Sequence, residues 1–209
     1  MKRATWYFDY ISPFAYLQWR RLRALGDPIA LDPVPILFAA VLDHVGQKGP
    51  AEIPGKRTFT YRFVHWQARR QGVPLRAPPA HPFNPMAALR LSIAAGNTPR
   101  AIDAIYAHIW ERGAKGDDAD SLAAVGRELG IADVAAAIAD PAVKAQLRSN
   151  TDGAIAAGVY GVPTLLIDGQ FFWGNDATEM ALDYVANPAL FDEPEMRRIS
   201  ELPATASRR

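Results

Sequence analysis

Apolar residues change their spacing twice within the first 36 residues of the chain. Residues 5–9 (TWYFD) form a short aromatic run that is typical of a buried strand. The apolar residues that follow recur at helical spacing until Gly26 ends the pattern. Residues 29–36 alternate apolar and other residues, but Pro33 and Pro35 cannot donate to a strand ladder. The pattern therefore predicts a strand, a helix and an edge strand, which together form a βαβ unit.

Between residues 37 and 158 the chain shows repeated helix signals and no clear strand signal. Helix starts are marked by a capping residue or a proline, and helix ends are marked by glycine. The first long helix carries Phe59, Phe63 and Trp66 at helical spacing. The predicted helix starts lie at Pro54-Gly55, Asn84-Pro85, Thr98-Pro99, Asp120 and Asp140-Pro141.

Strand signals return at residues 164–167 and 171–173, which are separated by Asp168-Gly169. An Asp-Gly pair between two apolar runs is a strong signal for a β-hairpin. A helix is expected to follow at about residues 176–186. The charged, proline-bearing tail after it is expected to be loosely ordered.

The predicted elements follow the order βαβ, a long helical block and ββα, which is the order of a thioredoxin core interrupted by helices. We therefore expect an α/β protein with a thioredoxin-like fold and a large all-helical insertion. The expected thioredoxin-like core comprises residues 1–36 and 159–187. The helical insertion comprises residues 37–158, and residues 188–209 form a C-terminal tail.

The composition is that of an ordinary globular protein and argues against several classes of function. The 209 residues are 49% hydrophobic and 22% charged, and the net charge of +1 gives no reason to expect nucleic-acid or membrane binding. No apolar run is long enough to span a bilayer, and the start lacks the apolar region of a secretory signal, so we expect a cytoplasmic protein. The histidines lack metal-ligand spacing, so we expect no metal site and interpret them as structural or surface residues. They are His44, His65, His81 and His108.

The turn that links the first predicted strand to the first predicted helix is the most informative feature. Thioredoxin-type proteins carry a Cys-x-x-Cys pair there, whereas this chain has Ser12-Pro13-Phe14-Ala15 and no cysteine anywhere, which excludes dithiol exchange. A hydroxyl at a helix N-terminus favours a negative group, so Ser12 can hold the thiolate of a small-molecule thiol such as glutathione. The alternative is that Ser12 only caps the helix. Serine hydrolysis is not expected, because no Gly-x-Ser-x-Gly elbow surrounds this residue.

Three further segments allow both a binding and a purely structural interpretation. A cis peptide between Val162 and Pro163 would expose the Val162 backbone to a ligand peptide, and the alternative is a plain turn. Asn175 and Asp176 either cap the last helix or bind the ammonium and carboxylate groups of a γ-glutamyl group. Lys56 and its basic neighbour lie at a helix start, where the dipole disfavours cations, which indicates an anionic partner or a solvated face.

Several of these segments resemble motifs of the 2-hydroxychromene-2-carboxylate isomerase family. The resemblance rests on residues 8–17 (FDYISPFAYL), 161–164 (GVPT) and 173–176 (WGND). Residues 46–56 are similar to the glutathione-binding segment of that family. The motifs occur in order and the likeness extends from the first strand to about residue 186. The family is related to kappa-class glutathione transferases and to the DsbA-like thioredoxin superfamily, which implies a fold of the DsbA and kappa-transferase type.

The resemblance also implies an activity, a glutathione-dependent cis–trans isomerisation in the degradation of naphthalene-type aromatics. The implied substrate is 2-hydroxychromene-2-carboxylate or a related small aromatic carboxylate, and the implied product is trans-o-hydroxybenzylidenepyruvate. Glutathione is the implied cofactor, and a homodimer is expected from the family alone.

Carried over by position, the resemblance assigns roles to individual residues. Ser12 matches the serine that faces the glutathione sulfur, and Val162 matches the residue that pairs with the cysteinyl backbone. Asn175 and Asp176 match the binders of the γ-glutamyl group, and Lys56 matches a basic residue that faces glutathione or the substrate carboxylate. The expected glutathione-binding residues are Pro13, Phe14, Gln47, Lys56, Val162, Pro163, Asn175 and Asp176.

Two positions depart from the family pattern, and two other functions stay open. Gln47 stands where family members often have asparagine, which keeps the amide on a side chain longer by one carbon. Ala177 stands where arginine commonly follows the aspartate, which removes ionic support for Asp176. The open alternatives are a kappa-like glutathione S-transferase, which would consume glutathione, and a non-catalytic thioredoxin-fold binding protein.

Overall fold

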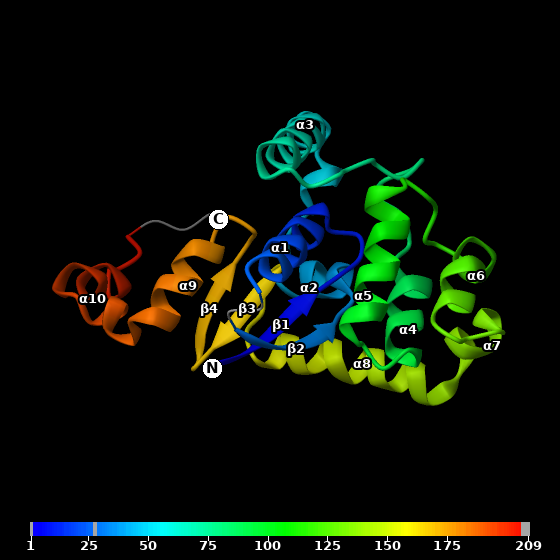
Figure 1. The fold of residues 1–209 in the computed structure, drawn as a ribbon. Helices are drawn as coiled ribbons and strands as arrows, with labels where there is room; N and C mark the ends of the chain where they lie inside the picture. Colours follow the sequence, from blue (N-terminus) through cyan, green and yellow to red (C-terminus); the bar gives the residue numbers. More distant parts are fainter. Residues whose placement is uncertain (1, 27–28, 206–209) are drawn as a thin grey trace.

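The computed structural model describes residues 2–26 and 29–205 and contains one four-stranded mixed sheet flanked by helices (Figure 1). The strands lie in the order β2-β1-β3-β4, which confirms that the second strand is an edge. β1 pairs in parallel with β2 and antiparallel with β3, and β3 pairs antiparallel with β4. This is the predicted α/β, thioredoxin-like arrangement. The strands are β1 (Arg3–Phe8), β2 (Ala30–Pro35), β3 (Thr164–Ile167) and β4 (Gln170–Trp173).

The prolines of β2 occupy one side of that edge strand. The N–H groups of Ala30 and Ile36 donate to backbone carbonyls on the β1 side, both at 2.9 Å. Because alternate residues of a strand point their N–H groups to opposite sides, the nitrogens of Pro33 and Pro35 face away from β1. Neither proline therefore removes a hydrogen bond from the sheet.

The predicted hairpin joins β3 to β4. Its two turn residues have positive φ angles, 50° at Asp168 and 82° at Gly169. Two left-handed residues in succession form a type I′ turn, whose twist matches that of paired strands. The Asp168 carboxylate also forms an ion pair with Lys2, which fastens the turn to the start of β1.

Residues 37–158 are helical or loop and contain no strand, as the spacing predicts. In Figure 1, α4 to α7 lie together beyond the β2 edge, α9 lies beside β4, and α3 stands apart at the top of the view. The helices of the first part are α1 (Pro13–Ala24), α2 (Phe38–His44), η1 (Pro50–Glu52), α3 (Pro54–Gln71), α4 (Met86–Ala94) and α5 (Pro99–Tyr106). The others are η2 (Ala107–Glu111), α6 (Ala119–Glu128), α7 (Val134–Ala139), α8 (Pro141–Ala156), α9 (Thr178–Ala186), η3 (Pro188–Asp192) and α10 (Pro194–Ser200).

A cluster of buried aromatic rings joins the sheet to the helices of the middle block. Trp6 of β1 stacks on Phe8 at 4.4 Å and on Trp19 of α1 at 5.2 Å between ring centroids. Tyr10 lies 4.7 Å from Tyr106 at the end of α5. Burying a side chain of this size stabilises a fold by roughly 2–3 kcal/mol. The middle helices therefore share one hydrophobic core with the sheet.

Two helix starts differ from the predicted positions. The Asp118 carboxylate, and not that of Asp120, caps α6 by accepting the N–H of Ser121 at 2.7 Å. Asp118 has the extended backbone of a capping residue, whereas Asp120 already lies in the first turn. The last helix of the core, α9, begins at Thr178, two residues later than expected, and its capping position is occupied by Ala177.

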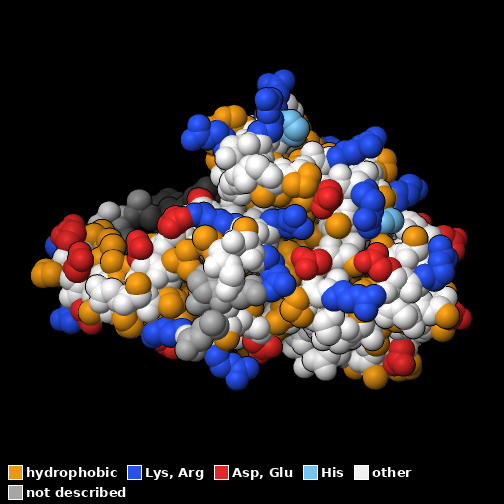
Figure 2. All heavy atoms as spheres, viewed as in Figure 1, with side chains coloured by type: hydrophobic (Ala, Val, Ile, Leu, Met, Phe, Trp, Pro, Cys, Tyr) orange, Lys and Arg blue, Asp and Glu red, His pale blue; other side chains and the backbone are white. Residues whose placement is uncertain are grey.

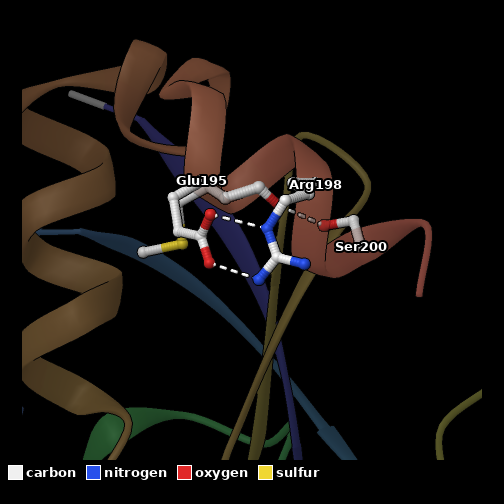
Figure 3. A network of polar contacts seen from close by, with 4 residues as sticks. Glu195, Arg198 and Ser200 are labelled. Carbon is white, nitrogen blue, oxygen red and sulfur yellow. Dashed lines mark hydrogen bonds and ion pairs between the residues drawn. The ribbon is translucent and has the colours of Figure 1, made fainter.

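The expectation of a loosely ordered tail is wrong for residues 188–200, which form η3 and α10. The ring of Phe191 stacks on Phe172 of β4 at 5.9 Å, so this segment packs against the edge of the sheet. Within α10 the Arg198 Nε donates to Glu195 at 2.7 Å, and the Ser200 hydroxyl donates to a backbone carbonyl of the preceding turn (Figure 3). The packing of Phe191 against β4 and the ion pair between Arg198 and Glu195 account for the ordered structure of this segment.

Charged side chains of both signs are spread over the surface shown in Figure 2, while Lys and Arg predominate over α3 at the top of the view. That helix carries several basic residues and no acidic one. Across residues 2–26 and 29–205, none of the helices combines the length and the apolar character needed to cross a bilayer. Within the same ranges, no group of three or more His, Asp or Glu side chains is arranged to hold a metal ion.

Two glycine-to-alanine substitutions should change stability in opposite directions. A Cβ at Gly126 would lie 2.2 Å from Val134 Cγ2 and 2.9 Å from a backbone oxygen, so Gly126→Ala should lower the free energy of unfolding by about 1–3 kcal/mol. Gly153 lies on the exposed side of α8 with no atom within 4 Å of that position. Gly153→Ala should raise the free energy of unfolding by about 0.5–1 kcal/mol. Urea unfolding measures both, and shifts of the same sign would contradict the packing at α6.

Candidate functional site

Three chain segments meet at one end of the sheet. Tyr7, next to the end of β1, lies opposite Thr164, which begins β3. Thr164 in turn lies opposite Trp173, which ends β4. The chain that leaves β1, the chain that enters β3 and the chain that leaves β4 are therefore neighbours. These segments carry Ser12, Val162-Pro163 and Asn175-Asp176, which the sequence singled out.

Ser12 is the N-cap of α1, and its side chain is oriented by that role. The Ser12 Oγ accepts the N–H of Ala15 at 3.2 Å, and Pro13 is the first helical residue. Capping uses a lone pair of the oxygen and leaves the hydroxyl hydrogen available, and within residues 2–26 and 29–205 that hydrogen has no acceptor. The first turn of α1 carries no acidic residue, so no carboxylate of the helix itself opposes an anion at its N-terminus. The cap and the donor interpretations of Ser12 are therefore compatible.

A buried carboxyl lies at the base of this turn. Asp9 is fully buried, its backbone carbonyl accepts the Ser12 N–H at 3.0 Å, and its carboxyl accepts N–H groups of Ile11 at 3.0 Å and Phe38 at 2.9 Å. Burial raises the pKa of Asp9 to about 7, and the hydrogen bonds from backbone N–H groups oppose the rise. Phe38 begins α2, whose own N-cap residue makes no side-chain cap bond. The Asp9 side chain thus joins the Ser12 turn to the start of α2.

The peptide bond between Val162 and Pro163 is cis, the form considered for this segment from the sequence. The Pro163 carbonyl accepts the N–H of Gly174 at 2.8 Å, which holds the two loops together. Gly161 lies against the indole of Trp173, because a Cβ there would be 2.3 Å from its Nε1. The Trp173 ring is itself half exposed, so it forms part of the surface beside this turn.

Asn175 is buried, with 2% of its surface exposed, yet neither its Oδ1 nor its Nδ2 has a hydrogen-bond partner among the described residues. Because α9 begins later, neither Asn175 nor Asp176 caps it, and the capping interpretation is wrong. Asp176 is exposed, and its carboxylate lies over Gly174, where a Cβ would be 2.4 Å from Oδ1 and φ is +95°. This segment therefore carries a buried amide, without a partner among the described residues, next to an exposed carboxylate.

A buried glutamine fixes that segment to α1. The Gln18 Oε1 accepts the indole N–H of Trp6 at 2.8 Å, and its Nε2 donates to the Gly174 carbonyl and to the Thr178 hydroxyl, both at 3.0 Å. The Thr178 hydroxyl donates to the Asn175 carbonyl at 2.7 Å. Every polar atom of the Gln18 amide that faces the protein is satisfied, so the backbone of Asn175 is held rigidly relative to α1.

The other residues expected to bind glutathione are Phe14, Gln47 and Lys56, which lie in or near α1, α2 and α3. The Phe14 ring contacts Phe63 with 6.4 Å between centroids, so α3 borders the Ser12 turn. Lys56 is exposed on the first turn of α3, and Gln47 is exposed after α2. In the part of the chain that the structure describes, no hydrogen bond or ion pair joins either side chain to that turn. Gln47 lines a hollow of about 560 Å³ together with Gly46, Lys48 and Ile53.

Two residues near Ser12 were not expected to matter from the sequence. His81, interpreted only as a structural or surface histidine, donates its Nε2–H to the Ile11 carbonyl at 2.7 Å. No local pattern could reveal a contact between residues 70 positions apart. Asp9 gave a clearer signal, because it is an acidic residue at the end of a run of aromatic residues that forms a buried strand. Arg57 is held by His81 and Tyr61 and is not a free cation.

The pKa of Asp9 makes stability depend on pH in a definite direction. Because the folded state raises this pKa from 3.8 to about 7, the contribution of Asp9 is fully present below pH 3.8 and is lost as pH rises through about 7. The Asp9→Asn variant serves as reference, because Asn does not titrate. The stability of wild type relative to this variant should fall by roughly 2–3 kcal/mol between about pH 5 and 8. Urea unfolding of both proteins at both pH values measures this difference in the free energy of unfolding. A difference that is constant or that grows with pH would contradict the assignment.

The comparisons with known proteins agree with this fold. The chain is 28% identical to 2-hydroxychromene-2-carboxylate isomerase of Sphingobium xenophagum, over 88% of this chain and 98% of the relative. It is also 28% identical to glutathione S-transferase kappa 2 of Caenorhabditis elegans, over 90% and 93% of the two chains. A solved structure of a 2-hydroxychromene-2-carboxylate isomerase has the same fold, with a TM-score of 0.78 at 22% identity and coverage of 96% and 99%. Residues 5–186 match the DSBA-like thioredoxin domain, and the chain belongs to that family.

Proposed function

We propose that this protein is a glutathione-dependent cis–trans isomerase that acts on 2-hydroxychromene-2-carboxylate or a related small aromatic carboxylate. The observation that carries the proposal is the state of Ser12, whose oxygen caps α1 while its hydroxyl hydrogen stays available at the positive end of that helix. The chain has no cysteine, so a thiolate at this position must belong to a ligand. The isomerase relatives at 28–29% identity support the reaction class.

The strength of the Ser12 site is sufficient to change the ionisation of a bound thiol. A hydrogen bond to a charged group contributes about 1.5–3 kcal/mol, and a helix N-terminus adds about 0.3–1 kcal/mol for an anion. One pKa unit corresponds to about 1.4 kcal/mol. Together these terms lower the pKa of a thiol held beside Ser12 by about one to three units, which makes the thiolate abundant at neutral pH.

The residues around Ser12 fit glutathione. Both polar atoms of the buried Asn175 side chain lack a partner, and leaving such a group unsatisfied costs about 1–3 kcal/mol, so a ligand group that pairs with them would bind favourably. Asn175 and Asp176 would hold the γ-glutamyl end, and the Val162 backbone beside Pro163 would pair with the cysteinyl backbone. When bound, glutathione supplies the thiolate that adds reversibly to the conjugated double bond and so permits its rotation.

The substrate would lie between the Ser12 turn and α3. Phe14 and Phe63 supply an apolar wall there, and the exposed ring of Phe59 extends it with 5.6 Å between the Phe59 and Phe63 centroids. Because α3 carries basic residues and no acidic ones, it favours an anionic substrate. Lys56 is the cation proposed to meet the substrate carboxylate or glutathione. Gln47, which lines the neighbouring hollow, belongs to the same proposed binding surface.

The second candidate function is a kappa-like glutathione S-transferase, which the kappa-class relative supports. Both activities need the same thiolate, so the Ser12 turn does not distinguish them. What differs is whether the sulfur leaves the product again. A homodimer and a cytoplasmic location are further parts of the proposal and rest on the family relationship and on the composition.

The stoichiometry of glutathione should separate the two candidates. With 2-hydroxychromene-2-carboxylate as substrate, an isomerase returns all of its glutathione, so free thiol stays constant while the product absorbance rises. A transferase loses one thiol for each product molecule. Thiol titration alongside mass spectrometry of the product measures the ratio. Recovery of a glutathione adduct in place of the free product would overturn the isomerase proposal.

Removing the Ser12 hydroxyl should impair ionisation of the thiol more than binding. Ser12→Ala should raise the pKa of bound glutathione by about one to two units, since the donor to the thiolate is lost. Turnover at neutral pH should fall about 10- to 100-fold as the thiolate fraction drops. Ultraviolet absorbance of the thiolate during a pH titration measures the pKa, and calorimetry measures affinity.

Thr98→Ala is the matched control for that substitution. Thr98 caps α5 with the same kind of bond, because its hydroxyl oxygen accepts the Ala101 N–H at 3.2 Å. Loss of this cap should lower the free energy of unfolding by roughly 0.5–2 kcal/mol, as for Ser12, and should leave the pKa of the bound thiol unchanged. Asn175→Ala should show the opposite balance, with weaker glutathione binding and a smaller change in the thiol pKa. Equal thiol pKa values in wild type and Ser12→Ala would refute the role of Ser12.

A further inference from the structure

We propose that His81 is a positioning residue for Ser12: it clamps the peptide bond between Ile11 and Ser12 and links it to α3. The inference rests on the proposed function, since it concerns the serine that would hold the thiolate. The sequence pattern alone indicates only a structural or surface histidine at this position.

The peptide bond in question is held at both ends. Its carbonyl, on Ile11, lies 2.7 Å from the Nε2 of His81, and its N–H, on Ser12, donates to the Asp9 carbonyl at 3.0 Å. A peptide unit fixed on both sides cannot rotate about its neighbouring bonds. That orientation sets the direction of the Ser12 Cβ, and the bond from the Ala15 N–H then places its oxygen. Loss of the His81 contact frees one of the two constraints.

The hydrogen bonds of His81 define which ring nitrogen carries the proton. The Ile11 carbonyl can only accept, so Nε2 must carry a hydrogen. Nδ1 lies 2.8 Å from the Tyr61 hydroxyl, which also lies 2.7 Å from the His81 carbonyl. Tyr61 has one hydrogen and two acceptors within reach. When the ring is neutral, the Tyr61 hydroxyl donates to Nδ1. When Nδ1 is protonated, the Tyr61 oxygen accepts its N–H and the Tyr61 hydrogen turns to the His81 carbonyl.

The Tyr61 hydroxyl therefore lets His81 change protonation without losing a hydrogen bond. In both states the His81 carbonyl also receives Arg57 Nη2 at 2.6 Å, and Arg57 Nε donates to the Tyr61 oxygen at 3.2 Å. Because Nε2 is an N–H donor in both states, the clamp on Ile11 is kept throughout. The Ser12 turn is thus held against α3 through His81, which is hydrogen-bonded to Tyr61 and Arg57 of that helix.

The surroundings of His81 favour its neutral form. From α3 it meets Arg57 and Tyr61, and from the other sides it meets the rings of Phe83 at 6.1 Å and Trp110 at 5.4 Å between centroids. Burial, and secondarily the charge of Arg57, lower the pKa of His81, while the bond to the Ile11 carbonyl opposes this. At neutral pH His81 is then an uncharged donor. Its effect on the site is one of orientation and not of charge.

The test compares three substitutions with a matched control. Gln places an N–H donor near the position of Nε2 but does not titrate, whereas Leu removes the donor, and Tyr61→Phe removes the second partner of the ring. His81→Leu should reduce turnover about 10- to 100-fold, because misplacing a reacting group by about 1 Å has an effect of that size. The KM for glutathione should change less than about threefold, since the binding groups are untouched. His81→Gln should restore most of the turnover, and His65→Leu, at an exposed histidine of α3, should behave as wild type.

The protonation state of the His81 ring can also be measured directly, without an activity assay. Nitrogen NMR of His81 in the ligand-free protein should show the Nε2–H tautomer near neutral pH, and Tyr61→Phe should lower the pH at which the ring titrates, because the imidazolium loses an acceptor. An Nδ1–H tautomer, or equal turnover in His81→Leu and His65→Leu, would overturn the inference. Should His81→Leu fail to fold, His81→Gln and Tyr61→Phe decide it by the same readings. Absence of glutathione binding in wild type would instead refute the proposed function and leave the tautomer result standing.

Discussion

The site depends on one buried carboxyl group at the end of the first strand. Asp9 receives the Ser12 N–H on its backbone carbonyl and two further N–H groups on its side chain, one from the turn and one from α2. Within the described chain no cation is paired with its carboxyl, so the burial is offset by backbone N–H groups and by a raised pKa that favours the neutral form. The same contacts orient the turn and begin α2, and the chemistry at Ser12 is therefore coupled to the packing of the sheet.

The order of secondary structure was predictable because its signals are local. Cap residues, prolines and glycines mark the starts and ends of the helices, and Asp168-Gly169 marks the hairpin. Boundaries moved where two candidates compete within a few residues, as Asp118 and Asp120 do before α6. The order of the tail was not predictable, because it depends on Phe191 packing against a ring of β4, a contact that composition does not reveal.

The candidate site was only partly predictable, for the same reason. The register of β1, β3 and β4 brings Ser12, Val162 and Asn175 to one end of the sheet, and the resemblance to a glutathione-binding family implied that these residues act together. The sequence could not show that Asn175 is buried without a partner, or that His81 reaches the Ile11 carbonyl. Both facts depend on loops whose paths are decided by the aromatic core. Chemistry carried by a short motif is visible in the sequence, whereas its support from distant residues is not.

The two prolines of β2 have a consequence for the free edge of the sheet. Their nitrogens face outward on the free side of that strand, where a further strand would need N–H donors to pair with it. With those donors missing, β2 is a poor template for β-augmentation or for edge-to-edge aggregation of the sheet. The β2 border therefore gives a second sheet little to pair with.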